Sequence, residues 1–244
     1  IWKYLSSSNL LSSYDQIEIS ELVQILTIEK AAHNKNYHEK DLLGGTDPYS
    51  ASKASAELVI QSYVKSYFIG DKKKLIAIAR AGNVVGGGDW SEDRLIHDCV
   101  RAWSNNKKVL IRNPYSTRPW QHVLEAIRGY LMLAKNLSKN KKINGEPFNF
   151  GPKFYQDKSV ISFLEEIKKN WKKVDWTIIK NNKSEKESNL LKLNSIKASK
   201  ILSWQPILKF NETTKMITEW YKNYYTKNSK TYNFSKKQIE EYSL

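Results

Sequence analysis

The segment from Asp47 to Lys53, together with the apolar run that follows it, most constrains the fold of this chain. Aspartate is a favoured N-cap and proline suits the first helical position, so a helix is predicted to begin at Pro48. Apolar residues then recur at helical spacing to about Phe68. The run from Leu75 to Val85 is almost continuously apolar, which is typical of a buried parallel strand that ends at a ligand site. This combination indicates an α/β fold.

The rest of the chain alternates in the same way. Short strands are predicted at 22–28, 108–112 and 148–150, and helices at 94–103 and 123–134. The segments 161–171, 176–179, 195–202 and 212–225 are interpreted as a small helix-rich domain. We therefore predict an α/β protein with an incomplete Rossmann-like parallel sheet and a smaller, helix-rich domain.

Composition narrows the class of protein. A hydrophobic fraction of 40% suits a globular chain, and no apolar run approaches the roughly 20 residues of a membrane span, so we expect a cytoplasmic protein with no membrane partner. The formal net charge is +15, but the lysines are dispersed and match no nucleic-acid-binding motif, so no nucleic-acid partner is expected. The single cysteine, Cys99, excludes an intrachain disulfide, and the four histidines lack metal-ligand spacing, so no metal is expected.

Tyr49 and Lys53 are the candidate catalytic pair. Residues four apart share one face of a helix, and an ammonium beside a phenol favours the phenolate. Tyr49 would then exchange a proton with a substrate hydroxyl, as in a tyrosine-dependent dehydrogenase. The spacing alone is weak, because Tyr232 and Lys236 share it; the helix and the buried strand around Tyr49 distinguish the two pairs.

The arginines suggest a phosphorylated ligand. The chain has six, all between residues 80 and 128, whereas lysines occur throughout. Arginine contacts phosphate in a bidentate manner, so this clustering favours a phosphate-bearing substrate.

Four blocks, in order along the chain, carry a family resemblance. They are Leu42–Lys53, Arg80–Trp90 with Gly-Gly-Gly-Asp-Trp, Arg118–Val123 with Arg-Pro-Trp-Gln-His, and Asn149–Pro152. Together they resemble the CDP-glucose 4,6-dehydratases, which are extended short-chain dehydrogenases, over roughly residues 37–225. The resemblance implies NAD as cofactor and CDP-glucose, or a related nucleotide sugar, as substrate. A homo-oligomer is among the expected assemblies.

The resemblance also implies roles for single residues. Tyr49 would take the proton of the sugar 4-hydroxyl as NAD oxidises C4, and Lys53 would bind the nicotinamide ribose. A Thr/Ser-Asp-Lys triplet in the family, which serves the dehydration, aligns with Ile28-Glu29-Lys30. Glu29 and Lys30 are therefore candidate catalytic residues, while Ile28 lacks the family hydroxyl.

The substrate side is assigned in the same way. Asn83, with Arg80 three residues earlier, and Arg118 would contact the sugar diphosphate. Arg94 and Arg112 are further candidates for lining the site, and simple surface charge is the alternative for both. Residues 1–90 are expected to belong to the dinucleotide-binding domain, with 116–151 returning to it, and 91–244 mainly to the nucleotide-sugar domain. His122 is expected to be a packed residue and Cys99 an inert one.

Two features oppose full activity. The chain contains no Gly-x-Gly-x-x-Gly or Gly-x-x-Gly-x-x-Gly motif, so we expect the C-terminal portion of such an enzyme, binding NAD weakly or not at all. Ile28 predicts weak or no turnover. The alternatives are a sugar-nucleotide epimerase of the same superfamily and a non-catalytic remnant or binding module.

Overall fold

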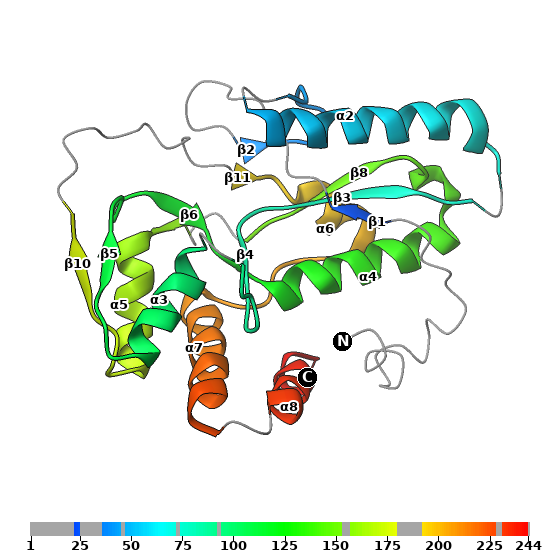
Figure 1. Ribbon diagram of the computed structural model, residues 1–244. Coiled ribbons are helices and arrows are strands. Elements are labelled where there is room, and N and C mark those ends of the chain that lie inside the picture. Colours follow the sequence, from blue (N-terminus) through cyan, green and yellow to red (C-terminus); the bar gives the residue numbers. More distant parts are fainter. Residues whose placement is uncertain are drawn as a thin grey trace. The chain divides into compact units, whose positions relative to one another are not determined.

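The computed structural model describes residues 22–24, 36–44, 47–71, 74–91, 94–152, 157–179, 192–227 and 231–243 (Figure 1). The chain divides into two compact units. Unit 1 comprises residues 1–82, 125–152 and 191–207, and unit 2 comprises residues 83–124, 153–190 and 208–244. Each unit has its own buried core.

Unit 1 contains a parallel three-stranded sheet in the order β1-β3-β8. The strands are β1 (Leu22–Gln24), β3 (Ala77–Ala81) and β8 (Pro147–Phe150). All five residues of β3 are buried, as the apolar run predicts for a strand covered on both faces. Helices α2 (Pro48–Tyr63) and α4 (Val123–Lys139) lie on opposite sides of this sheet (Figure 1).

Local signals explain where α2 begins. The carboxylate of Asp47 accepts the Ser50 backbone N–H at 2.9 Å and the Ser50 hydroxyl at 2.7 Å. Pro48 occupies the first turn, where its missing N–H costs nothing. The helix continues as a π-helical turn, η1 (Val64–Phe68), so the predicted end near Phe68 is confirmed.

The core of unit 1 forms between the sheet and α4. It includes Phe148, Phe150, Leu133 and Trp204, and the Phe150 and Trp204 rings meet edge to face with centroids 5.0 Å apart. Trp204 follows α6 (Ile196–Leu202), and a 3-10 turn, η2 (Lys141–Ile143), follows α4.

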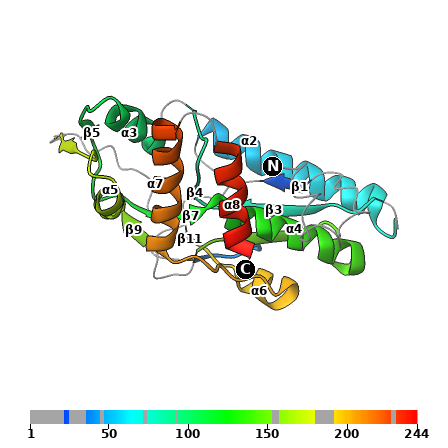
Figure 2. The ribbon, with the colours of Figure 1, turned by 90° about the horizontal axis from the view of Figure 1, so that it is seen from below.

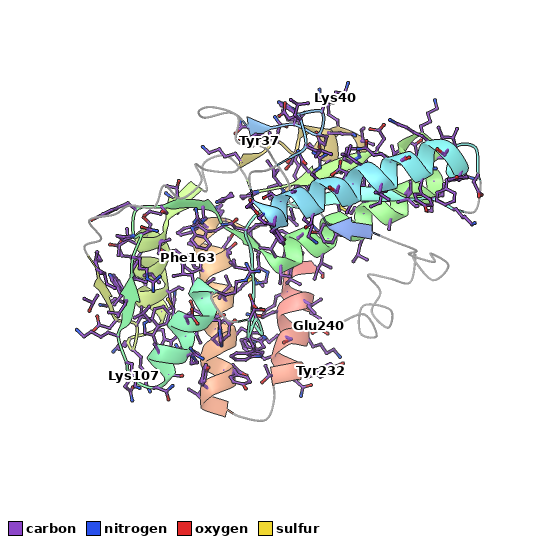
Figure 3. All side chains as sticks on the ribbon, turned by 45° about the horizontal axis from the view of Figure 1, so that its top comes forward. Tyr37, Lys40, Lys107, Phe163, Tyr232 and Glu240 are labelled. Atoms are coloured by element: carbon purple, nitrogen blue, oxygen red, sulfur yellow. The ribbon has the colours of Figure 1, made fainter. Side chains whose placement is uncertain are left out.

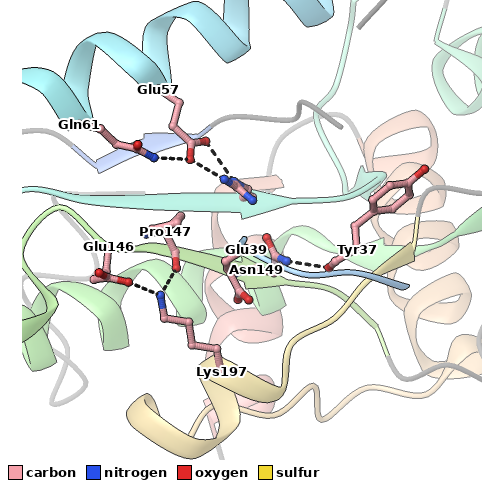
Figure 4. Close-up of polar contacts among 9 residues, drawn as sticks. Tyr37, Glu39, Glu57, Gln61, Glu146, Pro147, Asn149 and Lys197 are labelled. Carbon is pink, nitrogen blue, oxygen red and sulfur yellow. Dashed lines mark hydrogen bonds and ion pairs between the residues drawn. The ribbon is translucent and has the colours of Figure 1, made fainter. Parts of the chain in front are cut away.

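A second strand pair borders this sheet. β2 (Asn36–Tyr37) pairs in parallel with β11 (Lys192–Leu193). Figure 4 shows the Asn149 side-chain amide donating to the Tyr37 carbonyl at 2.9 Å, which ties β2 to β8. In the same view, the Lys197 ammonium bridges the Glu146 carboxylate and the Pro147 carbonyl, tying α6 to β8.

Unit 2 is built from short strand pairs and helices. The pairs are β4 (Val84–Val85) with β7 (Gln121–His122), parallel; β5 (Val109–Ile111) with β10 (Trp176–Ile178), parallel; and β6 (Thr117–Pro119) with β9 (Asp157–Ser159), antiparallel. The helices are α3 (Leu95–Ser104), α5 (Val160–Asn170), α7 (Phe210–Lys227) and α8 (Thr231–Ser243). Figure 2 shows α7 and α8 side by side.

The core of unit 2 is rich in aromatic residues. Phe163 is completely buried (Figure 3), and Trp120 stacks on it with ring centroids 4.3 Å apart. Trp103 and Trp171 meet edge to face at 6.0 Å. Large rings therefore supply much of the buried apolar area in a unit whose strands are only two or three residues long.

The predicted α/β class is confirmed, with some differences in detail. The predicted segment 195–202 contains α6 (Ile196–Leu202), which belongs to unit 1 and not, as its predicted grouping implied, with α5 and α7 of unit 2. Trp176–Ile178 is a strand. The apolar run from Leu75 divides into β3 and β4 because Gly82 and Asn83 interrupt it. None of the described helices is long and apolar enough to cross a membrane.

Candidate functional site

Tyr49 and Lys53 lie on one face of α2, as their spacing predicts. The Lys53 ammonium nitrogen is 5.7 Å from the centroid of the Tyr49 ring. The Tyr49 side chain is 59% exposed, and Lys53 is half-buried. The phenol is therefore accessible to a ligand, and a cation stands beside it.

The sheet positions this end of α2. α2 runs antiparallel to β3, so its N-terminus lies at the carboxyl end of β3 (Figure 1). A buried ion pair between Glu57 of α2 and Arg80 of β3 joins the two elements (Figure 4). The carboxyl end of a parallel strand is where α/β proteins place their ligands, and Tyr49 lies at that edge.

Arg80 corrects one expectation. Its side chain is 2% exposed and both oxygens of the Glu57 carboxylate accept from it, so it is not available to a substrate diphosphate. Arg128 is also engaged, since its guanidinium donates to the Gln205 carbonyl and lies 3.7 Å from the Glu125 carboxylate. The clustering of arginines is therefore not in itself a phosphate-binding signal.

Asn83 lies at a junction between strands. It follows β3, and its backbone carbonyl accepts the Gln121 N–H at 3.2 Å. The next rung of the ladder pairs Val84 with Gln121. The Arg-Pro-Trp-Gln-His block thus runs directly alongside Asn83. Two of the sequence blocks, this one and Arg80–Trp90, therefore lie next to each other in the structure.

Arg118 lies on β6 and is half-buried. It pairs across the ladder with Lys158 of β9, and its Nη1 donates to the Thr117 carbonyl at 3.3 Å. Its neighbour Trp120 is a core residue whose indole N–H donates to the Lys158 carbonyl at 2.8 Å. Trp120 therefore anchors the block, while Arg118 keeps part of its surface accessible.

The remaining predicted site residues are less informative. Arg94 directly precedes α3 and Arg112 directly follows β5, and both side chains are exposed. Glu29, Lys30 and Ile28 lie outside the described residues. Tyr49 and Lys53 belong to unit 1, and Asn83, Arg94, Arg112 and Arg118 belong to unit 2.

His122 and Cys99 are packed residues, as expected. His122 is 3% exposed, and its Nδ1 accepts the Leu124 N–H at 3.2 Å; burial lowers its pKa to about 4, so the ring is neutral at pH 7. Burial, together with the charge of Asp98, raises the pKa of the Cys99 thiol to about 12, which keeps it protonated. Among the described residues, no cluster of three or more histidine, cysteine or acidic side chains could hold a metal ion.

The Gly-Gly-Gly-Asp-Trp block has a packing role that its sequence does not reveal. A Cβ at Gly87 would overlap the Trp220 indole, and Gly88 has a φ of +81°, which disfavours other residues. The Tyr221 hydroxyl donates to the Asp89 carbonyl at 3.1 Å. The block thus packs against α7, and no local pattern reveals these partners because they lie more than 130 residues away along the chain.

Comparisons with known proteins agree with these motifs. The family model of GDP-mannose 4,6 dehydratase matches residues 30–217. The CDP-glucose 4,6-dehydratase of Salmonella typhimurium strain LT2 is 37% identical over 226 residues, which are 89% of this chain and 63% of that protein. The dTDP-D-glucose 4,6-dehydratase of Homo sapiens is 25% identical over 223 residues, 87% of this chain and 59% of that protein. The chain thus spans about three fifths of the length of these relatives.

Solved structures support the fold. The UDP-glucuronic acid 4-epimerase of Bacillus cereus in complex with NAD matches with a TM-score of 0.69 at 20% identity, covering 89% of this chain and 66% of that one. The dTDP-glucose 4,6-dehydratase of Bacillus anthracis in complex with NAD matches with a TM-score of 0.62 at 21% identity, covering 80% and 58%. Because its family model covers more than half of the residues, the chain belongs to the GDP-mannose 4,6 dehydratase family of NAD-dependent sugar-nucleotide dehydratases.

Proposed function

We propose that this chain carries the tyrosine–lysine pair and the nucleotide-sugar-binding part of a CDP-glucose 4,6-dehydratase. The observation that carries the proposal is the placement of Tyr49 and Lys53, with an exposed phenol beside a cation at the carboxyl edge of a parallel sheet. The 37% identity to a CDP-glucose 4,6-dehydratase and the Arg-Pro-Trp-Gln-His block support CDP-glucose as the substrate.

In this proposal, unit 1 is the dinucleotide-binding part and unit 2 is mainly the nucleotide-sugar-binding part. Tyr49 removes the proton of the sugar 4-hydroxyl, and Lys53 stabilises the phenolate and binds a ribose hydroxyl. Glu29 and Lys30 handle the proton at C5 and the departing C6 hydroxyl. Asn83 and Arg118 hold the diphosphate, and Arg94 and Arg112 are secondary candidates for that role.

NAD fits only in part to the residues of this chain. The hydroxyl of Tyr49 and the ammonium of Lys53 suit the ribose next to nicotinamide, whereas the sequence contains no glycine-rich motif of the kind that holds a pyrophosphate. When bound, NAD would supply the oxidation at C4 and the later reduction at C6. We propose that tight NAD binding requires a glycine-rich segment in addition to these residues.

Self-association is a further part of the proposal. α2 buries Glu57 yet exposes an uncharged outward face, which comprises Ala51, Ser52, Ser55, Leu58, Val59, Tyr63 and, in η1, Tyr67. Small side chains occupy its N-terminal half and large ones its C-terminal half. Two copies packed antiparallel would place large residues against small ones, which favours a two-fold dimer.

The experiment is a turnover assay of a longer protein that joins this chain to a glycine-rich NAD-binding segment, supplied with NAD and CDP-glucose; the 4-keto product is followed by its absorbance in alkali. We expect slow turnover that Ile28→Thr raises by about 10²–10³, because a hydroxyl there would bond the oxygen on which charge develops. Tyr49→Phe should abolish that turnover, whereas Tyr232→Phe, at the other tyrosine of this spacing, should not. Equal rates with Ile28 and Thr would reject the alignment of the triplet, and no product from either would favour a non-catalytic module.

A further inference from the structure

Gln121 presents a buried amide that no other part of the described chain uses. Its side chain is 2% exposed, and neither its Nε2 nor its Oε1 has a hydrogen-bond partner among the described residues. Its backbone is well held, since its N–H donates to the Asn83 carbonyl and β7 pairs with β4. The side chain is therefore buried on a hydrogen-bonded strand, and its donor group and its acceptor group both lack a partner among the described residues.

A buried amide of this kind is energetically unfavourable unless its donor and acceptor groups form hydrogen bonds. A buried amide left unpaired loses its hydrogen bonds to water without replacing them, which is why buried polar groups almost always have partners. Gln238 is a matched example in the same unit: it is 6% exposed, and its Nε2 donates to the Met216 carbonyl at 2.8 Å. The different state of Gln121 calls for a partner that is not part of the described chain.

The surroundings of Gln121 indicate what that partner is. It lies on the strand pair beside Asn83 and three residues after Arg118, the two residues proposed to hold the diphosphate. The amide itself is a poor diphosphate ligand, because its carbonyl oxygen would face an anion that offers no proton. A neutral group that both donates and accepts satisfies both ends of the amide.

We propose that the Gln121 amide is a specificity-determining contact of the nucleotide-sugar site, which hydrogen-bonds a neutral donor–acceptor group of the ligand next to the diphosphate. Two parts of a nucleotide sugar have this chemistry: the hydroxyls of the hexose and the amide-like edge of the pyrimidine. The inference deepens the proposed function and rests on it.

The test compares Gln121→Leu with the unchanged chain by calorimetric titration with CDP-glucose and with CDP, alongside denaturant unfolding. We expect affinity to fall roughly tenfold, as for the loss of one buried hydrogen bond, while resistance to unfolding stays the same or rises because an unpaired polar group is removed. Weakening with CDP-glucose alone would assign the contact to the hexose, and weakening with both ligands would assign it to the nucleoside. The Gln121 side-chain amide signal in a ¹H–¹⁵N spectrum should also shift when ligand is added to the unchanged chain.

Gln238→Leu is the control, because it removes an amide that is already paired within unit 2. It should lower stability and leave both affinities unchanged. Equal affinities of the Gln121→Leu variant and the unchanged chain would overturn the inference while leaving the proposed function intact. If the unchanged chain bound neither CDP-glucose nor CDP, the proposed function would fail and the inference with it. Loss of folded structure in both Gln121→Leu and the similarly sized Gln121→Met would show that the fold itself needs the amide, which also overturns the inference.

Discussion

Arg80 and Glu57 form a bidentate ion pair inside unit 1. Arg80 Nε donates to Glu57 Oε2 at 3.0 Å, Nη2 donates to Oε1, and the two side chains are 2% and 0% exposed. The Gln61 amide donates to the same carboxylate at 3.2 Å. The pair joins α2 to β3, so the position of Tyr49 at the edge of the sheet depends on two buried charges.

We predict that Glu57→Ala lowers the free energy of unfolding by about 3–5 kcal/mol, because it leaves the Arg80 guanidinium buried without a counter-charge. The double variant Glu57→Leu with Arg80→Met should recover most of this loss, since it removes both charges from the interior. Urea unfolding measures both. The control is Glu166→Ala, which breaks a pair with the exposed Lys169 and should cost about 1 kcal/mol or less. A similar small loss at Glu57 would show that the buried pair does not hold α2.

The contact between Gly87 and Trp220 leads to a second prediction. Gly87→Ala would press a methyl group into the indole, so it should destabilise the chain by about 1–3 kcal/mol. Trp220→Leu costs stability by itself but opens space for that methyl group. In a double-mutant cycle, the stability loss of the double variant should therefore be smaller than the sum of the losses of the two single variants. Simple additivity would mean that Gly87 is required for a reason other than this contact.

The parts of the fold that were predicted from sequence have local causes. The start of α2 follows from Asp47 and Pro48, and β3 follows from an apolar run that is long enough to be covered on both faces. The Tyr49–Lys53 geometry follows from helical spacing alone. Each of these features depends on neighbours within a few residues.

The unpredicted parts depend on partners that are distant in sequence. β2 and β11 are each two residues long and lie more than 150 residues apart. Strands this short show no alternation of apolar and polar residues that could be detected in the sequence. Arg80 has the same sequence appearance whether it meets a substrate phosphate or the carboxylate of Glu57, 23 residues away. That the Gln121 amide lacks a partner among the described residues depends on which groups surround it in space, and no local sequence pattern shows these groups.

The outward face of α2 leads to a third prediction. Tyr63→Glu places a charge among the large side chains of this uncharged face, so it should shift the chain from dimer to monomer in sedimentation equilibrium, because a buried unpaired charge is costly. Tyr115→Glu, at a tyrosine of unit 2 that is also exposed (76%, against 54% for Tyr63), should leave the dimer intact. A chain that is monomeric before either substitution would refute self-association through this face. Dissociation by both variants would indicate a general effect of charge instead.

His122 predicts how stability depends on pH. Burial lowers the pKa of this imidazole to about 4, while an unfolded histidine titrates near 6.5. Between these values the unfolded chain binds a proton that the folded chain does not, so protonation favours unfolding. The contribution of the neutral His122 ring to the free energy of unfolding is therefore fully present above about pH 6.5, and it is lost as the pH falls toward 4. The slope is at most about 1.4 kcal/mol per pH unit, which over the roughly 2.5 pH units between the two pKa values gives an upper bound of about 3.5 kcal/mol.

The variant His122→Asn isolates this contribution. The asparagine carbonyl can accept the Leu124 N–H that His122 Nδ1 accepts, and it does not titrate. We expect the unchanged chain to lose about 1–2 kcal/mol more than the variant between pH about 7 and about 5, as measured by urea unfolding at both values. His38→Asn, the same substitution at an exposed histidine, controls for effects of the replacement itself. Equal losses in His122→Asn and the unchanged chain would mean that the folded protein accommodates a charged ring, and that acid sensitivity arises from its carboxylates alone.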